Sequence, residues 1–303
     1  MHIKGDSRDL PSIVLGCMRI HEKSDAENAV LIQSAIEQGI NFFDHADIYG
    51  RGESERIFAR VAKTLGLKRE DIILQSKSAI KPGIAFDCSK AYIIESVEHI
   101  LHRLNTDYLD YYLLHRPDAL MNAAEVAEAF ERLRSQGKVK HFGVSNQNTH
   151  QMQLLNHFTD HQIVVNQLQL SIAHCPIIDT GLNVNMNNHE ACDRDGGILP
   201  YCQKENIALQ AWSPFQYGFF EGVFIGNAKF AELNLRLEQM SEHYQAPVEA
   251  IATAWLLRLP VAMQVIVGTT NPERLTRIAQ AARIRLSRED WYALYLAAGK
   301  KLP

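Results

Sequence analysis

The chain has 303 residues, of which 46% are hydrophobic and 22% charged, and its formal net charge at pH 7 is −4. This composition is typical of a globular protein, and a weakly acidic chain without a dense Lys/Arg run argues against a nucleic-acid partner. Five scattered cysteines without a C-x-x-C pair indicate neither a disulfide framework nor a zinc site, so no metal is expected. No apolar stretch approaches the ~18 residues of a membrane span, and residues 1–10 carry no signal region, which favours a cytoplasmic protein without a membrane partner.

Short β-branched or aromatic runs recur along the chain, each followed by a longer stretch with helical spacing. In chain order, the predicted strands span residues 12–16, 40–44, 71–77, 108–115, 139–145, 163–167, 207–213 and 264–268. Among the intervening segments, residues 91–104 show apolar side chains every three or four positions, which predicts an amphipathic helix. Residues 246–258 show the same spacing, and Pro247 suits the first turn of that helix.

Eight alternating strand–helix units predict a parallel α/β sheet, and closing the eight strands into a ring is the commonest way to bury them. The alternative is a doubly wound open sheet, which normally carries G-x-G-x-x-G after its first strand. Here the first strand gives "VLGCMRI", which lacks that motif. Since no low-complexity linker divides the chain, we expect residues 1–303 to form a single (β/α)8 TIM-barrel domain.

A parallel barrel concentrates function at the carboxyl ends of its strands. Asp44 ends the second predicted strand, Lys77 the third and His115 the fourth, and Tyr49 follows Asp44 by five residues. Polar loops would explain some hydrophilic strand ends, but not readily an Asp, a Lys and a His at the ends of three successive strands. We therefore expect these four side chains to line one pocket.

The four residue types make chemical sense together. A tyrosine hydroxyl has a reference pKa of about 10, so it is a poor acid or base at neutral pH. A lysine ammonium beside Tyr49, held in place by Asp44, would favour the phenolate and lower that pKa, while His115 could orient a carbonyl oxygen. Such a set would deliver one proton to a carbonyl, and the electrons would have to come from a cofactor.

Seven segments, in order, resemble motifs of the aldo-keto reductase superfamily, whose members are NAD(P)H-dependent (β/α)8 barrels. They are "FDHADIYG", "QSK", "LLHRPD", "FGVSN", "VVNQLQ", "AWSPF" and "VIVGTTNPERL". The resemblance extends from about Leu15 to Ile278, and in detail it looks closest to a bacterial oxidoreductase subgroup typified by YdhF. It implies NADPH-dependent reduction of a small aldehyde or ketone, with a catalytic set formed by Asp44, Tyr49, Lys77 and His115.

The resemblance also implies where a nicotinamide would bind. Ser145, Asn146 and Gln167 would hold its carboxamide, and Trp212 stands where many members place a tyrosine that stacks on the ring. The Ser-Asn pair could instead cap the following helix, because both residue types are favoured there. The long aromatic segment 213–231 would form a flap over the pyrophosphate, or else a loop packed over the barrel rim.

At the adenosine end, two positions depart from the family pattern. Gly268 stands where many members place a lysine for the 2′-phosphate, and Ile278 where an adenine-contacting Asn is often found, so Arg274 would carry most of a preference for NADPH. The complete set expected to contact the cofactor is Gly16, Met18, Asp44, Ser145, Asn146, Gln167, Trp212, Ser213, Phe215, Gly218, Gly268, Thr269, Thr270 and Arg274.

Two other functions stay open. One is a binding or sensing protein that keeps the barrel and the nucleotide without turnover, and the other is a Schiff-base lyase that uses Lys77 as nucleophile.

Two further expectations concern the pocket. His45 replaces a more usual small residue and would narrow or polarise the pocket, and the polar segment 176–197 would border its mouth. We expect a monomer or a weak oligomer.

Overall fold

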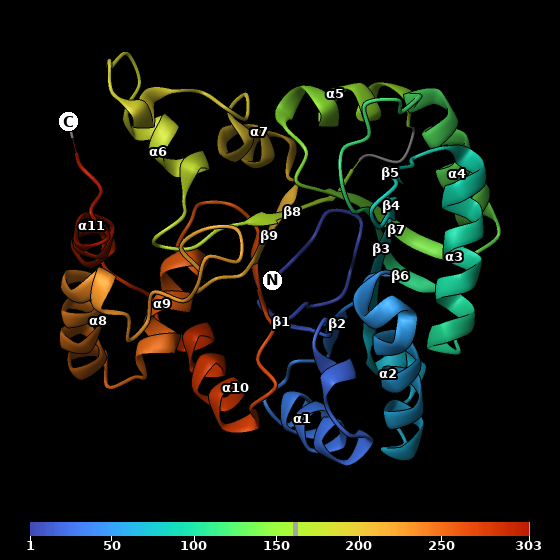
Figure 1. Ribbon diagram of the computed structural model, residues 1–303, viewed down its shortest axis with the longest axis horizontal. Coiled ribbons are helices and arrows are strands. Elements are labelled where there is room, and N and C mark those ends of the chain that lie inside the picture. Colours follow the sequence, from blue (N-terminus) through green and yellow to red (C-terminus); the bar gives the residue numbers. More distant parts are fainter. Residues whose placement is uncertain (160–162, 303) are drawn as a thin grey trace.

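A computed structural model describes residues 1–159 and 163–302, and in this part of the chain eight parallel strands close into a ring (Figure 1). Their order around the ring is β1-β10-β9-β8-β7-β6-β3-β2, and β1 pairs with both β2 and β10. The predicted (β/α)8 barrel is therefore confirmed, and the open doubly wound sheet is wrong. The strands are β1 (Ile13–Gly16), β2 (Phe42–Asp44), β3 (Ile73–Ser78), β6 (Leu109–Leu114), β7 (Val139–Ser145), β8 (Val165–Gln169), β9 (Ala208–Trp212) and β10 (Met263–Val267).

Helices surround the ring on its outside (Figure 1). Helices that follow one another in the chain are mostly neighbours, and α1 also contacts α10, which helps to close the outer layer. A small antiparallel hairpin, β4 (Ile80–Lys81) and β5 (Ala85–Phe86), is inserted after β3. The helices are α1 (Asp25–Glu37), α2 (Glu53–Thr64), α3 (Lys90–Leu104), α4 (Ala123–Ser135), α5 (Thr149–Phe158), α6 (Pro176–Leu182), α7 (Ile198–Glu205), α8 (Ala231–Tyr244), α9 (Val248–Leu257), α10 (Pro272–Ala279) and α11 (Arg288–Ala297).

Local sequence explains where several helices begin. At α1, the Ser24 side chain accepts from the backbone N–H of Glu27, whose carboxylate accepts in return from the backbone N–H of Ser24. This capping box satisfies two amides that otherwise lack partners, a contribution of typically ~1 kcal/mol. At α9, Pro247 is the N-cap residue, one position before the first turn in which it was expected.

Side chains alternate between the inside of the barrel and the layer beneath the helices. Phe42 points inward and stacks on Tyr111 with ring centroids 5.4 Å apart, whereas Phe43 points outward to Phe58 of α2 at 4.7 Å. Each fully buried aromatic or aliphatic side chain of this kind stabilises the fold by roughly 1.5–3 kcal/mol. Because successive strand residues face opposite sides, Asp44 faces inward like Phe42.

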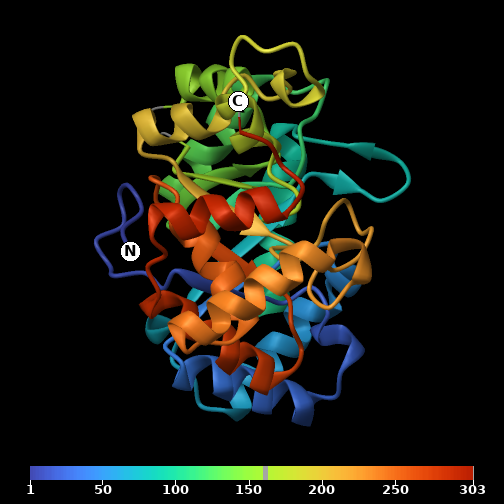
Figure 2. The ribbon, with the colours of Figure 1, turned by 90° about the vertical axis from the view of Figure 1, so that its left-hand side faces the viewer.

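The two ends of the barrel differ in their loops. Figure 2 shows the β4–β5 hairpin and the loop after β9 projecting on one side, while the N-terminal segment lies on the other. The first of these sides is the one on which the strands end, so long segments gather where a barrel places its functional groups. Among the helices of residues 1–159 and 163–302, none combines the length and apolar character that crossing a membrane requires.

Candidate active site

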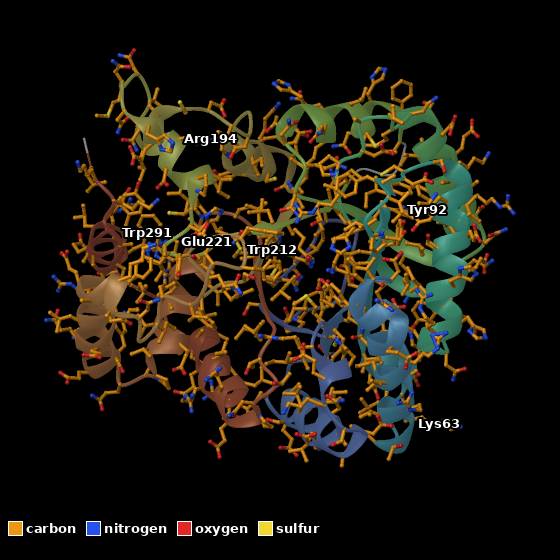
Figure 3. All side chains as sticks on the ribbon, viewed as in Figure 1. Lys63, Tyr92, Arg194, Trp212, Glu221 and Trp291 are labelled. Atoms are coloured by element: carbon orange, nitrogen blue, oxygen red, sulfur yellow. The ribbon has the colours of Figure 1, made fainter. Side chains whose placement is uncertain are left out.

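A cavity of about 830 Å³ opens at the carboxyl ends of the strands. Trp212, one of its lining residues, lies near the middle of the ring of helices, whereas Lys63 and Tyr92 lie toward the outside (Figure 3). Ligand and cofactor sites commonly have volumes of roughly 300–1,000 Å³. The predicted site residues that line the cavity are Gly16, Met18, Asp44, Tyr49, His115, Ser145, Asn146, Gln167, Trp212, Ser213, Phe215, Gly268, Thr269 and Arg274.

Lys77 and Asp44 form a buried ion pair at the base of this cavity. Nζ of Lys77 lies 2.6 Å from Oδ1 of Asp44 and 2.7 Å from the carbonyl oxygen of His45. Parallel pairing of β2 with β3 sets Asp44 opposite Gln75, and Lys77 follows two residues later on the same face. Burial lowers the pKa of Lys77, and the Asp44 carboxylate opposes that shift. Lys77 itself is fully buried and is not among the cavity-lining residues.

Glutamine side chains complete the surroundings of Asp44. Nε2 of Gln75 donates to Oδ1 of Asp44 at 2.6 Å, and Nε2 of Gln167 donates to the same atom at 3.0 Å. Both amides also donate to Oε1 of Gln210, and Nε2 of Gln210 in turn donates to Oε1 of Gln264. These bonds form a connected polar layer inside the barrel that fixes the position of the carboxylate. Sequence analysis missed Gln75 and Gln210, because a glutamine within a strand has no distinctive pattern.

Tyr49 begins the short turn segment η2 (Tyr49–Gly52), in which Gly50 and Arg51 have positive φ, just beyond the end of β2. Its ring meets that of His115 edge-on, with 6.1 Å between centroids, and Nζ of Lys77 lies 5.2 Å from its centre. Among the described residues the hydroxyl has no hydrogen-bond partner, so it is free to donate to a ligand in the cavity. The turn needs glycine at Gly52, whose φ is 86° and where a Cβ would approach an arginine side chain to 2.8 Å.

The surroundings of Tyr49 favour its protonated form. Burial raises the pKa of the phenol well above its usual value, and the Asp44 carboxylate raises it further. The expectation of a net lowered pKa is therefore wrong for this arrangement, because the Lys77 ammonium is bonded to Asp44 and His45 and does not outweigh the effects of burial and of Asp44. Burial lowers the pKa of His115 well below its usual value, so its imidazole is neutral at pH 7. A neutral His115 can donate one hydrogen bond into the cavity.

Ser145 and Asn146 lie at the end of β7 and both line the cavity. Nδ2 of Asn146 donates to Oγ of Ser145 at 2.8 Å, and the Asn146 backbone is left-handed with φ 53°. The following helix, α5, is capped by Asn148, whose side chain accepts from the backbone N–H of Gln151. The alternative that Ser145 and Asn146 cap this helix is therefore wrong, and their side chains face the cavity instead.

Segment 213–230 covers one side of the cavity. Oγ of Ser171 anchors it by donating to the carbonyl of Gln216 at 2.6 Å, and Nε2 of Gln169 donates to the carbonyl of Gly218 at 2.8 Å. Gly218, which is expected to contact the cofactor, does not line the cavity. The residues of the segment that do line it are Ser213, Pro214, Phe215, Gln216, Phe219, Phe220, Val223 and Ile225.

Two arginines lie where β1 and β10 end. Arg274, in the first turn of α10, lines the cavity and has no ion-pair partner within the described ranges. Arg19, which sequence analysis missed, donates through Nε to the carbonyl of Gly268 at 3.1 Å and through Nη2 to the same oxygen. A Cβ on Gly268 would lie 3.4 Å from Nη2 of Arg19. The Arg19 guanidinium therefore places a positive charge beside Gly268, which has no charged side chain of its own. Thr269 lines the cavity but Thr270 does not, and the expected contact of Thr270 with the cofactor stays a prediction.

His45 does not face the cavity. Its ring packs edge-on against Phe58 of α2, with 4.8 Å between centroids, and both ring nitrogens are buried without a partner among the described residues. Burial lowers the pKa of His45 to about 3. The expectation that His45 narrows or polarises the pocket is therefore wrong, because it follows the inward-facing Asp44 and so points outward.

The polar segment 176–197 does not border the cavity either. None of its described residues is among those that line it, and the carbonyl of Asp195 accepts from the backbone N–H of Thr149 in α5 at 3.1 Å. Sequence analysis also missed Arg116, which follows His115 and does line the cavity. The arginine is visible in "HRPD", but an arginine at a strand end has no distinctive pattern.

Comparison with known proteins assigns the chain to a family. Residues 12–295 match the Aldo/keto reductase family, and the chain belongs to it. The chain is 35% identical over 299 residues to Uncharacterized oxidoreductase YcsN of Bacillus subtilis (strain 168), covering 94% of this chain and 93% of that protein. It is 31% identical over 275 residues to Oxidoreductase YdhF of Escherichia coli (strain K12), with 88% and 86% covered.

Among solved structures, an aldo-keto reductase from Klebsiella pneumoniae in complex with NADPH has a TM-score of 0.77 and 27% identity to this chain. The match covers 97% of this chain and 94% of the other. The predicted relationship to aldo-keto reductases, with YdhF-type oxidoreductases among the relatives, is thus confirmed.

Proposed function

We propose that the protein reduces aldehydes or ketones to alcohols with NADPH, by direct hydride transfer. One observation carries the proposal: the side chain of Tyr49 shares the cavity with His115, lies near the buried pair of Lys77 and Asp44, and has a hydroxyl without a hydrogen-bond partner among the described residues. When bound, NADPH would supply the hydride, and the chain would supply the proton and the orientation of the carbonyl.

Tyr49 would be the proton donor. Its raised pKa keeps the phenol protonated at pH 7, and the transfer becomes favourable as negative charge develops on the carbonyl oxygen. A neutral His115 would donate a second hydrogen bond to that oxygen and so stabilise the developing charge. Lys77 would neutralise Asp44, whose carboxylate otherwise disfavours the phenolate that forms when the proton leaves.

The residues around the cavity fit a phosphorylated dinucleotide. Ser145 and Asn146 present polar groups for a carboxamide, and Trp212 presents a large ring for stacking. Arg19 and Arg274 are cations without an ion-pair partner in the described part of the chain, as phosphate groups require. Segment 213–231 would act as the flap over the pyrophosphate. The NADPH complex of the Klebsiella pneumoniae relative supports this choice of cofactor.

The geometry gives less support to a Schiff-base lyase. A nucleophilic amine must reach a substrate carbonyl, whereas Nζ of Lys77 is buried and bonded to Asp44. A sensor that binds the nucleotide without turnover would need neither the Tyr49 hydroxyl nor the buried ion pair of Lys77 and Asp44 near it.

The test follows the absorbance of NADPH with p-nitrobenzaldehyde as substrate and quantifies the alcohol product by chromatography. We expect one alcohol formed for each NADPH oxidised. Binding of NADPH without oxidation across aldehydes, diones and sugars would support the sensor, and covalent trapping of a carbonyl compound on Lys77 by borohydride would support the lyase.

A further inference from the structure

Arg116 is a cation on the wall of the cavity that has no counter-ion among the described residues. It follows His115 just beyond the end of β6, is half-buried, and lines the cavity together with Tyr49 and His115. Within residues 1–159 and 163–302, its guanidinium makes no ion pair and no hydrogen bond, and Cζ lies 5.7 Å from the centre of the Phe219 ring. A half-buried guanidinium in this state has lost part of its hydration, and the Phe219 ring replaces neither the lost hydrogen bonds nor a negative charge.

The carboxylates of the cavity wall do not compensate this charge. Asp44 is neutralised by Lys77 at 2.6 Å, and Glu249 by Arg277 at 2.9 Å. Burial lowers the pKa of Arg116, and among the described residues Tyr49 opposes this shift. The cavity therefore keeps an uncompensated positive charge near the Tyr49 hydroxyl, and an anionic ligand would offset the cost of desolvating it.

The order of strands separates Arg116 from the residues proposed to bind the cofactor. Ser145, Gln167, Trp212 and Gly268 lie at or just beyond the ends of β7, β8, β9 and β10, which form one arc of the ring. The neighbouring arc, β6-β3-β2, carries the proposed catalytic residues, and Arg116 belongs to it. A carbonyl oxygen bound by Tyr49 and His115 would thus bring one substituent of the carbonyl toward the guanidinium.

We propose that Arg116 selects carbonyl substrates that carry a carboxylate, that is, aldehyde acids or keto acids. The planar guanidinium offers two parallel N–H groups that match the two oxygens of a carboxylate, while the Phe219 ring offers apolar surface to the carbon skeleton. This inference rests on the proposed function, because it names the substrate class of the same site.

A matched pair of aldehydes tests the proposal in the NADPH-loaded enzyme. 4-Carboxybenzaldehyde and 4-formylbenzamide are similar in size, but only the first is charged. We expect kcat/KM to be about ten- to hundredfold higher for the carboxylate. Arg116→Gln should bring this ratio near one. Arg116→Lys should keep only part of the preference, because lysine retains the positive charge but not the two parallel N–H groups of the guanidinium. Arg236→Gln removes an exposed charge on α8 and should leave the ratio of the parent.

Ligand binding gives a readout that does not depend on turnover. Titration with benzoate, followed by quenching of tryptophan fluorescence, should show affinity reduced about tenfold or more in Arg116→Gln, with a smaller change for benzamide. A circular-dichroism melt checks that each variant is folded. Equal kcat/KM for the two aldehydes in the parent, or equal benzoate affinity in parent and variant, would overturn the proposal. If the parent binds benzoate through Arg116 but reduces neither aldehyde, the anion site stands and the reductase function fails.

Discussion

Nζ of Lys77 lies 2.6 Å from Oδ1 of Asp44 and 5.2 Å from the centre of the Tyr49 ring, so the ammonium is bonded to the carboxylate and not to the phenol. Lys77 thus acts on Tyr49 mainly by compensating a negative charge that disfavours the phenolate. Burial and Asp44 both raise the pKa of Tyr49, which keeps this residue in the form that a proton donor needs.

Replacement of Tyr49 by Phe removes the proposed proton donor and little else. Since the hydroxyl has no hydrogen-bond partner among the described residues, Tyr49→Phe should keep the fold and the affinity for NADPH. The kcat for p-nitrobenzaldehyde should fall by ~10²–10⁴-fold, the usual contribution of general acid catalysis. Steady-state kinetics and a fluorescence titration with NADPH measure the two quantities, and turnover equal to that of the parent would remove Tyr49 from the mechanism.

Removal of the Lys77 ammonium should raise the pKa of Tyr49 further, because Asp44 then stays uncompensated beside it. In Lys77→Met we expect carbonyl reduction to fall by at least ~10²-fold. The rising limb of the pH profile for alcohol oxidation, which needs the phenolate, should move to higher pH. In the double variant Lys77→Met/Asp44→Asn the limb should move less, since the carboxylate is gone as well. Equal shifts in the two variants would show that Asp44 acts on Tyr49 only through Lys77.

The sequence predicts the barrel and the gathering of Asp44, Lys77 and His115, because parallel strands bring their carboxyl ends to one edge. It also held the information that His45 points away from the cavity, since neighbouring strand residues face opposite sides. By contrast, the bond from Arg19 to Gly268 joins residues 249 positions apart. Such a contact depends on the reach and rotamer of one long side chain, which no local pattern encodes.

The preference for NADPH should depend on two arginines and not on Arg274 alone. Each charge-assisted contact to a phosphate contributes roughly 1.5–3 kcal/mol, so we expect NADPH to bind about ten- to hundredfold more tightly than NADH. Arg274→Ala and Arg19→Ala should each reduce this preference, and the double variant should lose most of it. Titrations with both cofactors, with Arg236→Ala as a surface control, measure the effect. If NADPH and NADH lose affinity equally in Arg274→Ala, that residue does not contact the 2′-phosphate.

The last prediction concerns stability and its dependence on pH. Burial lowers the pKa of His45 to about 3, against 6.5 for an ordinary histidine, and neither ring nitrogen has a partner in the described residues. Between these two pKa values the unfolded chain binds a proton that the folded chain does not, so His45 lowers the free energy of unfolding as pH falls below about 6.5. At pH 5 this effect amounts to about 2 kcal/mol.

A leucine at this position has a similar volume, no ring nitrogens to desolvate and no proton to bind, and it would still pack against Phe58. His45→Leu should therefore unfold at higher urea concentration than the parent at pH 7.5, with a gain on the order of 1–3 kcal/mol. The gain should increase further at pH 5. His99→Leu provides the matched control, because His99 is exposed on α3 and its replacement should change the free energy of unfolding by less than about 0.5 kcal/mol. A His45→Leu difference that stays constant from pH 7.5 to pH 5 would show that His45 can be protonated in the folded protein.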